Sequence, residues 1–499
     1  MTVAQLDQFL LFGTVVLLLA VLAVRASVRF GLPSLLIYLA MGVAMGESGL
    51  GIRFDNAELA HALGFAALVV ILAEGGLTTR WSDVRPALVP GLLLATVGVG
   101  VSITVVAVVV HILLGFDWQL AFLLGAVLSP TDAAAVFSVL RRVPLPRRLA
   151  GVLEAESGLN DAPTVLVVVT LSSVSAATEN PGIVTATILL ELALGTVIGF
   201  VIGWCGAWML RRVALPSSGL YPLATVAFAV LSYAAASTAH TSGFAAVYVA
   251  SLVLGNAELP HRPTVRSFVE GLAWLAQIGL FVMLGLLAWP SRLGLDDLVA
   301  GLVTGVALTF LARPVSVLIS MLPVRMRARE QLFLSWAGLR GAVPIVLATI
   351  PLAADMAGAN RIFDVVLIVV VVFTLVQAPT LPTVARLLRI PGEDEVRDLD
   401  IDAAPLERIE ADLLEIRIHP ASKLAGVEVG ELRLPPGASV ALVVRDGRSV
   451  VPSGGTILRM GDDLLVVTPR RLRDATERRI RAVSRGGRLA DWLRSRRGG

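Results

Sequence analysis

Four acidic residues interrupt the apolar middle of this sequence. Asp132 ends the motif SPTD (residues 129–132), and the motif EAESGLND (residues 154–161) carries the other three. An ionisable side chain inside a bilayer costs at least about 2.5–3.5 kcal/mol even on the most lenient scale, so such residues indicate a functional site. A third motif, GLRGAVP (residues 338–344), places one arginine among glycine, proline and apolar residues. Interrupted helices in corresponding positions of two halves are typical of a transport site.

A helix through residues 154–161 would sort its polar side chains onto two neighbouring faces. Glu154, Ser157 and Asp161 fall within roughly 60° of one face, because a helix turns by about 100° per residue. Glu156 and Asn160 lie on the adjoining face. Hydroxyl and carboxylate oxygens are hard ligands that suit an alkali cation, whereas the carboxylate and amide of the second face could receive a guanidinium.

The motif SPTD predicts a break in its helix. Pro130 lacks a backbone donor and disfavours helix at the residue before it. The carbonyls freed near Ser129 and Thr131 can supply further oxygen ligands. Asp132 stands near the start of the following half-helix, where the helix dipole stabilises a negative charge. A dehydrated monovalent cation needs such a ring of oxygens.

Arg340 lies at the matching break in the second half of the sequence. Arginine does not deprotonate in proteins, and a buried arginine must be paired. We expect Glu156 to be the partner of Arg340, and Glu74 with Arg313 to form a second, helix-holding pair. Glu154 has two interpretations, a structural acid near the cytoplasmic mouth or part of the access route, and the sequence leaves both open.

The composition identifies the membrane as the surroundings of these residues. Of the 499 residues, 56% are hydrophobic and 16% are charged, whereas about a quarter are charged in a soluble protein. A span needs about 20 mostly apolar residues. The sequence predicts thirteen spans, at residues 8–25, 31–48, 59–77, 87–115, 118–140, 149–174, 183–210, 220–238, 243–257, 264–289, 296–320, 330–353 and 361–388.

The distribution of arginine predicts the orientation. Arginines concentrate in alternate loops, and such loops face the cytoplasm. This places the N-terminus outside and the C-terminus in the cytoplasm of a multi-pass protein in the cell (inner) membrane. The broken spans, 118–140 and 330–353, are seven apart in order and therefore cross in opposite directions. We expect an all-α membrane protein with two inverted six-helix repeats, joined by span 183–210, and a small cytoplasmic α/β domain.

The sequence divides into four segments. Residues 1–390 form the transmembrane domain, and 391–405 form an acidic linker. Residues 406–475 form the predicted α/β domain, because residues 412–468 alternate in hydropathy like short strands. Residues 476–499 form an Arg-rich tail, for which contact with anionic lipid and simple disorder are both open.

Several classes of function are excluded. The single cysteine, Cys205, excludes an intrachain disulfide and a cysteine metal cluster. No Walker-type phosphate loop is present, which argues against ATP-driven pumping. We expect no enzyme activity, no cofactor and no nucleic-acid partner.

These motifs resemble those of the monovalent cation:proton antiporter-1 family, which exchanges sodium or potassium for protons. The resemblance covers residues 8–390. It implies that Asp161 carries cation and proton in turn, with Thr131 and Ser157 as ligands and Asp132 contributing. It also implies a supporting network of Asn160, Glu156 and Arg340, and a homodimer.

The C-terminal domain resembles the TrkA-C type of regulatory domain found in regulators of potassium conductance. The resemblance rests on motifs such as LPPGA (residues 434–438) and MGDDLLVV (residues 460–467). The companion Rossmann half is absent, so NAD binding is not expected. A nucleotide-type regulatory ligand, such as a cyclic dinucleotide, and a plain dimerisation role both remain open.

The mechanism that follows is secondary antiport. A carboxylate removed from water holds a proton more readily than a solvated one, so it can exchange that proton for a cation. One exchanging carboxylate predicts electroneutral 1:1 exchange. By the resemblance, Asn160 also stands where electrogenic relatives have a second acid. Potassium is favoured over sodium by the regulatory domain. The alternatives are a Na+/H+ antiporter, a ligand-gated potassium channel, which would need a filter motif that is absent, and a transport-dead sensor.

Overall fold

The computed structural model divides the chain into two compact units, Met1–Ile390 and Pro391–Gly499. It describes residues 3–30, 34–47, 49–52, 54–132, 135–136, 139, 145–173, 181–390, 399–406, 411–419, 422–445 and 448–487. Each unit has its own hydrophobic core and is described by itself.

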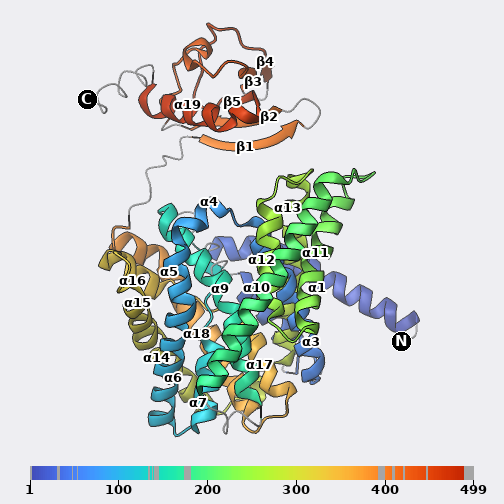
Figure 1. The fold of residues 1–499 in the computed structure, drawn as a ribbon, viewed down its shortest axis with the longest axis vertical. Coiled ribbons are helices and arrows are strands. Elements are labelled where there is room, and N and C mark those ends of the chain that lie inside the picture. Colours follow the sequence, from blue (N-terminus) through green and yellow to red (C-terminus); the bar gives the residue numbers. More distant parts are fainter. Residues whose placement is uncertain are drawn as a thin grey trace. The chain divides into compact units, whose positions relative to one another are not determined.

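The first unit is a bundle of helices (Figure 1). In chain order the helices are α1 (Val3–Phe30), α2 (Ser34–Met45), α3 (Ala57–Thr78), α4 (Trp81–Val84), α5 (Leu88–Leu93), α6 (Val99–Leu114), α7 (Trp118–Leu128), α9 (Arg147–Ser172), α10 (Pro181–Arg212), α11 (Leu220–Thr238), α12 (Gly243–Asn256), α13 (Arg262–Leu287), α14 (Leu295–Ala307), α15 (Arg313–Met321), α16 (Ala328–Trp336), α17 (Ala342–Ala353) and α18 (Ala359–Leu387). Among the described residues, seven helical segments are long and apolar enough to cross a membrane, and five shorter apolar helices accompany them. The chain is therefore a multi-pass membrane protein.

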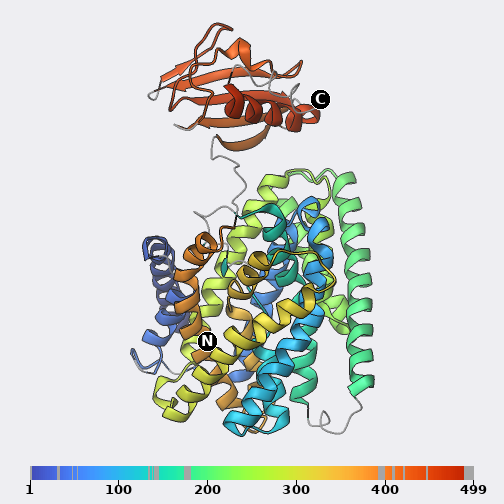
Figure 2. The same cartoon turned by 90° about the vertical axis from the view of Figure 1, so that its left-hand side faces the viewer.

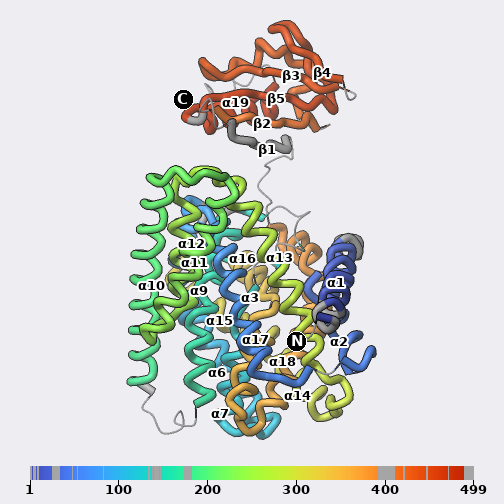
Figure 3. Tube along the Cα trace, turned by 90° about the vertical axis from the view of Figure 1, so that its right-hand side faces the viewer, coloured from blue at the N-terminus to red at the C-terminus, as the bar shows by residue number. Residues whose placement is uncertain are grey.

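The helices pack in two groups. One group contains α2, α3 and α10 to α13, and the other contains α5 to α7, α9 and α14 to α18. Figures 2 and 3 show α1 and α10 at opposite edges of the unit. Small residues allow close packing within the first group: a Cβ on Gly42 of α2 would meet the Cα of Gly285 of α13 at 2.8 Å, which is how membrane helices approach without a hydrophobic driving force.

Two spans of the second group are interrupted where the sequence predicts. Helix α7 ends at Leu128, directly before the SPTD motif. Helix α16 ends at Trp336, and α17 starts at Ala342 after a non-helical stretch. The span before each break contains a wider π-helical turn, η2 (Leu94–Gly98) before the first and η5 (Leu308–Ala312) before the second. Such turns often mark functional sites.

The second unit is an antiparallel sheet with one helix. The strands are β1 (Leu399–Leu406), β2 (Ala411–Ile418), β3 (Ser439–Arg445), β4 (Arg448–Val450) and β5 (Asp463–Pro469), in the spatial order β1-β2-β5-β3-β4. Leu414 lies opposite Val466, and Val443 lies opposite Leu464. These apolar side chains form the core together with Ile480 and Val483 of helix α19 (Arg473–Gly486).

The bounds of this unit in the structure differ from those predicted from the sequence. Strand β1 includes residues 399–405 of the predicted linker, because it completes the edge of the sheet beside β2. Helix α19 extends beyond residue 475 into the predicted tail, residues 476–499, because Ile480 and Val483 are buried in the core of this unit. Residues 391–398 and 488–499 lie outside the described residues.

Candidate functional site

The two interrupted spans meet at their breaks. The backbone N–H of Asp132 donates to the carbonyl of Leu339 at 2.9 Å, and this bond joins the first broken segment to the second. The side chain of Asn160 on α9 donates to the hydroxyl of Thr131 at 3.0 Å. Three segments that are distant in the sequence thus converge at one place inside the bundle.

Arg340 holds the C-terminal ends of two half-helices. Its Nε donates to the carbonyl of Leu128, the last residue of α7, at 2.7 Å, and its Nη1 donates to the carbonyl of Gly338, just beyond α16, at 2.8 Å. A helix C-terminus carries the equivalent of about −0.5 charge. The fixed positive charge of Arg340 therefore offsets two such ends.

Asp132 takes the opposite position, at helix starts. Its Oδ1 accepts from the backbone N–H of Ala135 at 3.1 Å. Its carboxylate also lies against Gly341, the residue before α17: a Cβ added to Gly341 would overlap Oδ2 of Asp132. Negative charge is favoured at helix N-termini, so Asp132 and Arg340 balance the dipoles that the two breaks expose.

Asp161 is the buried acid that has no cationic partner in the described structure. It is 8% exposed, and its Oδ1 forms no hydrogen bond to the described residues. Among those residues no arginine, lysine or histidine forms a salt bridge with it. Asp132 and Tyr248 lie within electrostatic range of Asp161. Ser157 precedes Asp161 by one turn of α9 and is half-buried.

The predicted ion pairs of this region are wrong. Glu156 pairs with Arg313, not with Arg340: the two guanidinium nitrogens of Arg313 lie 2.5 and 2.8 Å from the two carboxylate oxygens. Arg313 begins α15 directly after the π-helical turn η5, and its side chain is only 5% exposed. Arg340 uses backbone carbonyls instead.

The Glu74–Arg313 pair is also not formed, since Arg313 is bound to Glu156. Glu74 lies near the end of α3, within electrostatic range of Glu270 and Arg266 on α13. Those two residues pair with each other at 3.0 Å. Glu74 therefore belongs to the α3–α13 contact and not to the Arg313 network. Glu154 is half-buried on α9, within electrostatic range of Tyr248.

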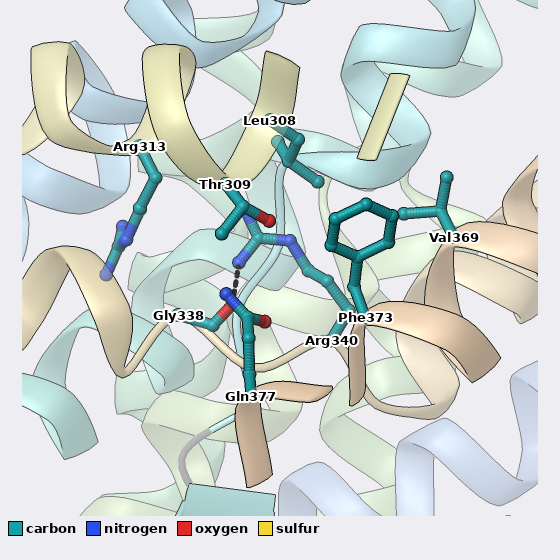
Figure 4. A pocket seen from close by; sticks show the side chains of 8 residues that line it. All are labelled: Leu308, Thr309, Arg313, Gly338, Arg340, Val369, Phe373 and Gln377. Atoms are coloured by element: carbon teal, nitrogen blue, oxygen red, sulfur yellow. Dashed lines mark hydrogen bonds between the residues drawn. The ribbon is translucent and has the colours of Figure 1, made fainter. Parts of the chain in front are cut away.

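Three polar residues of the site were missed by sequence reasoning. The hydroxyl of Thr374 donates to the carbonyl of Arg340 at 3.1 Å. Thr309 of η5 and Gln377 of α18 line a small cavity beside Arg340 (Figure 4). A glutamine within the apolar run of span 361–388 was a usable signal, whereas a threonine in such a run gives none.

This arrangement suits the exchange of a small cation for a proton. Oxygen atoms of Thr131, Asp132 and Asp161 lie near the breaks, and Ser157 lies one turn before Asp161 on α9. Asn160 is held by Thr131. Among the described residues no group of three or more His, Cys, Asp or Glu side chains fits a metal ion. A buried carboxylate without a fixed cationic partner is stabilised either by a proton or by a bound cation.

Comparison with known proteins agrees with this chemistry. Residues 14–387 match the family of the sodium/hydrogen exchanger transmembrane domain, and residues 413–481 match the TrkA-C domain. The chain is 37% identical over 462 residues to the K(+)/H(+) antiporter NhaP of Alkalimonas amylolytica, covering 91% of this chain and 80% of that protein. It is 36% identical over 471 residues to the K(+)/H(+) antiporter NhaP2 of Shewanella sp. (strain ANA-3), covering 93% and 81%.

A solved structure shares the fold. The sodium proton antiporter MjNhaP1 from Methanocaldococcus jannaschii aligns with a TM-score of 0.65 and 22% identity, over 75% of this chain and 99% of that one. A more distant relative in sequence, the Na(+)/H(+) antiporter ApNhaP of Aphanothece halophytica, is 27% identical over 85% of this chain and 83% of its own length.

Proposed function

Because the chain belongs to the sodium/hydrogen exchanger family, we propose that it is a secondary antiporter that exchanges K+ for H+ across the cell membrane. The observation that carries the proposal is the buried carboxylate of Asp161, which has no cationic partner in the described structure. Burying an uncompensated charge is costly. A proton or a monovalent cation removes that cost, and the two cannot occupy the carboxylate together.

The exchange is proposed to be electroneutral. Asp161 carries one proton in one direction and one monovalent cation in the other. The neighbouring charges stay fixed, since Glu156 is neutralised by Arg313 and Arg340 is held on two helix ends. Asn160 contributes an amide and no second titrating acid. Thr131, Ser157 and Asp132 complete the oxygen ligands of the cation.

The proposed architecture has thirteen spans in two inverted six-helix repeats. Its support is the order of features: a span with a π-helical turn precedes each broken span, η2 before the first break and η5 before the second. The arginine distribution supports an external N-terminus and a cytoplasmic C-terminus. We further propose that the protein is a homodimer.

The cation is proposed to be K+ because the two most similar of the relatives above are K(+)/H(+) antiporters. The TrkA-C domain would regulate exchange, with a nucleotide-type ligand as the proposed signal, and we propose no other cofactor. Sodium is the second candidate, favoured by the relative from Aphanothece halophytica. Maintenance of internal pH would be the physiological result.

Purified protein in liposomes that contain a pH dye tests the proposal. The vesicles are challenged separately with K+ and Na+ while the membrane potential is clamped. We expect a pH change with K+, a smaller one with Na+, and no dependence on potential. Comparable responses would leave antiport intact and remove the K+ preference, whereas a dependence on potential would contradict electroneutral exchange. Silence with both cations would contradict antiport, provided that protein lacking residues 391–499 is silent too.

A further inference from the structure

A water-sized cavity lies beside Arg340, and η5, the second break and α18 form its walls. Its volume is about 10 Å3, the room that one water molecule needs. Apolar side chains, including Val369 and Phe373, form part of the wall. The polar lining comes from Thr309, Arg340 and Gln377, which are 6%, 4% and 4% exposed. In Figure 4 the guanidinium of Arg340 lies between the side chains of Thr309 and Gln377.

These three polar groups have hydrogen-bonding capacity that their protein neighbours do not use. Arg340 binds carbonyls through Nε and Nη1, and in the described part of the chain no hydrogen bond engages its Nη2. The same holds for the hydroxyl of Thr309 and the side-chain amide of Gln377 within the described residues. A buried polar group left without a partner costs about 1–3 kcal/mol. These three groups, together with Nε of Arg313, which also lines the cavity and has no hydrogen-bond partner among the described residues, therefore point to a shared partner.

The charges around the cavity decide what that partner is. The charge of Arg340 is offset by the carbonyl ends of α7 and α16, each worth about half a charge. The charge of Arg313, which also contributes to the wall, is neutralised by Glu156. No net positive charge remains to be matched by an anion. The amide of Gln377 both donates and accepts, and the hydroxyl of Thr309 does the same, which suits a neutral guest with two donors and two acceptor sites.

We infer that one water molecule occupies this cavity and bridges Arg340 Nη2, Thr309 and Gln377. The water ties the π-helical turn η5 and helix α18 to the arginine that holds both broken spans. Thr309 and Gln377 are then positioning residues: they do not touch the cation, but they fix Arg340 and, through the carbonyl of Leu128, the start of the SPTD segment that supplies cation ligands. The water site itself does not depend on the proposed function. Only the effect of Thr309 and Gln377 on the kinetics of exchange rests on it.

The direct test is a high-resolution cryo-electron microscopy map of the full chain in lipid nanodiscs. We expect a density peak within hydrogen-bonding distance of all three groups. Val369→Leu, which adds bulk to the cavity wall without changing a polar group, should remove the peak. A map that resolves other buried waters and shows no peak here would overturn the inference. A second map can be recorded with bromide in place of chloride in the buffer. A heavier peak at this place would also overturn the inference, since the guest would then be an anion.

Stability measurements test whether the residues share one partner. Thr309→Val and Gln377→Leu should each lower the melting temperature of the purified protein, and the double variant should fall by little more than the larger single effect. Groups that act independently would give additive losses, which would contradict a shared water. Thr304→Val is the matched control, because Thr304 is a fully buried threonine on α14 that does not line the cavity.

Kinetics test the positioning role separately. Thr309→Val and Gln377→Leu should raise the half-saturating cation concentration several-fold, while Thr309→Ser, which keeps the hydroxyl, should restore the wild-type value. A role confined to folding would lower the amount of active protein and leave that concentration unchanged. If wild-type protein shows no exchange, the proposed function fails, whereas the density and stability results still decide the water site.

Discussion

Arg313 and Glu156 form a two-point ion pair across 157 positions of the sequence, with N–O distances of 2.5 and 2.8 Å. Both side chains are almost completely buried, at 5% and 2% exposure. The pair neutralises one acid of helix α9 and leaves Asp161, five residues further along the same helix, without such a partner among the described residues. The two acids therefore differ: Glu156 is compensated within the fold, whereas Asp161 is the acid to which the proposed function assigns the exchangeable proton or cation.

Asp161→Asn should abolish exchange and preserve the fold. The amide has the size of the carboxylate but cannot bind a cation by charge or carry a proton. Exchange in the liposome assay should fall to the level of empty vesicles, while the melting temperature stays equal or rises, since an uncompensated buried charge is removed. The control is Asp297→Asn, which alters an acid paired at 3.7 Å with Arg361, outside the site. Exchange that persists in Asp161→Asn would remove Asp161 from the centre of the mechanism.

Breaking the Glu156–Arg313 pair should destabilise the protein strongly. Glu156→Gln leaves the guanidinium buried without its counter-charge, and removing one partner of a buried pair typically costs about 3–5 kcal/mol. Arg313→Met should cost a similar amount, whereas Glu156→Gln with Arg313→Met should cost less than the sum of the two. A melting-temperature cycle in detergent measures this coupling. Additive single effects would show that the pair contributes little to stability.

Gly341→Ala should disturb the junction of the two breaks. A Cβ at this position would overlap the carboxylate of Asp132, so the acid must move from the start of α17. We expect a large loss of exchange, with a smaller effect on expression. Gly100→Ala serves as the control, since no atom lies within 4 Å of its added Cβ. Equal activity of the two variants would mean that the position of Asp132 does not matter.

The C-terminal unit should lose stability in acid through Asp462. Burial of this carboxyl works against ionisation, but hydrogen bonds from Arg445 and from the backbone N–H of Arg459 outweigh it and lower the pKa of Asp462 below its usual value. A carboxylate whose pKa is lower in the folded state stabilises the fold above its unfolded pKa, near 3.9, and loses this contribution as the pH falls through the folded value.

Asp462→Asn should therefore be less stable than the wild type at pH 7, and the difference should shrink below about pH 4. Urea unfolding of the isolated residues 391–499, followed by circular dichroism, measures both curves. Asp474→Asn provides a control, because Asp474 is exposed on α19. A difference that stays constant with pH would show that the Arg445–Asp462 pair does not depend on ionisation.

The sequence by itself determined where the spans break and which acids lie near the breaks. These features are local: Pro130 and the glycines around Arg340 act on their own backbone, and hydropathy sums over one span at a time. It also identified the segment 154–161, because charged residues are rare in apolar runs. Their roles in exchange remain predictions that the variants above test.

Only the tertiary structure decided which charges meet. From the sequence, we expected Glu156 to pair with Arg340, but helical periodicity says nothing about a partner 157 or 184 positions away. Packing placed Arg313 beside Glu156 and left Arg340 on the carbonyls of Leu128 and Gly338. The physical reason is that a guanidinium binds whichever oxygens the packed helices bring within about 3 Å, and that distance is set by the packing of helices and not by the chain between them.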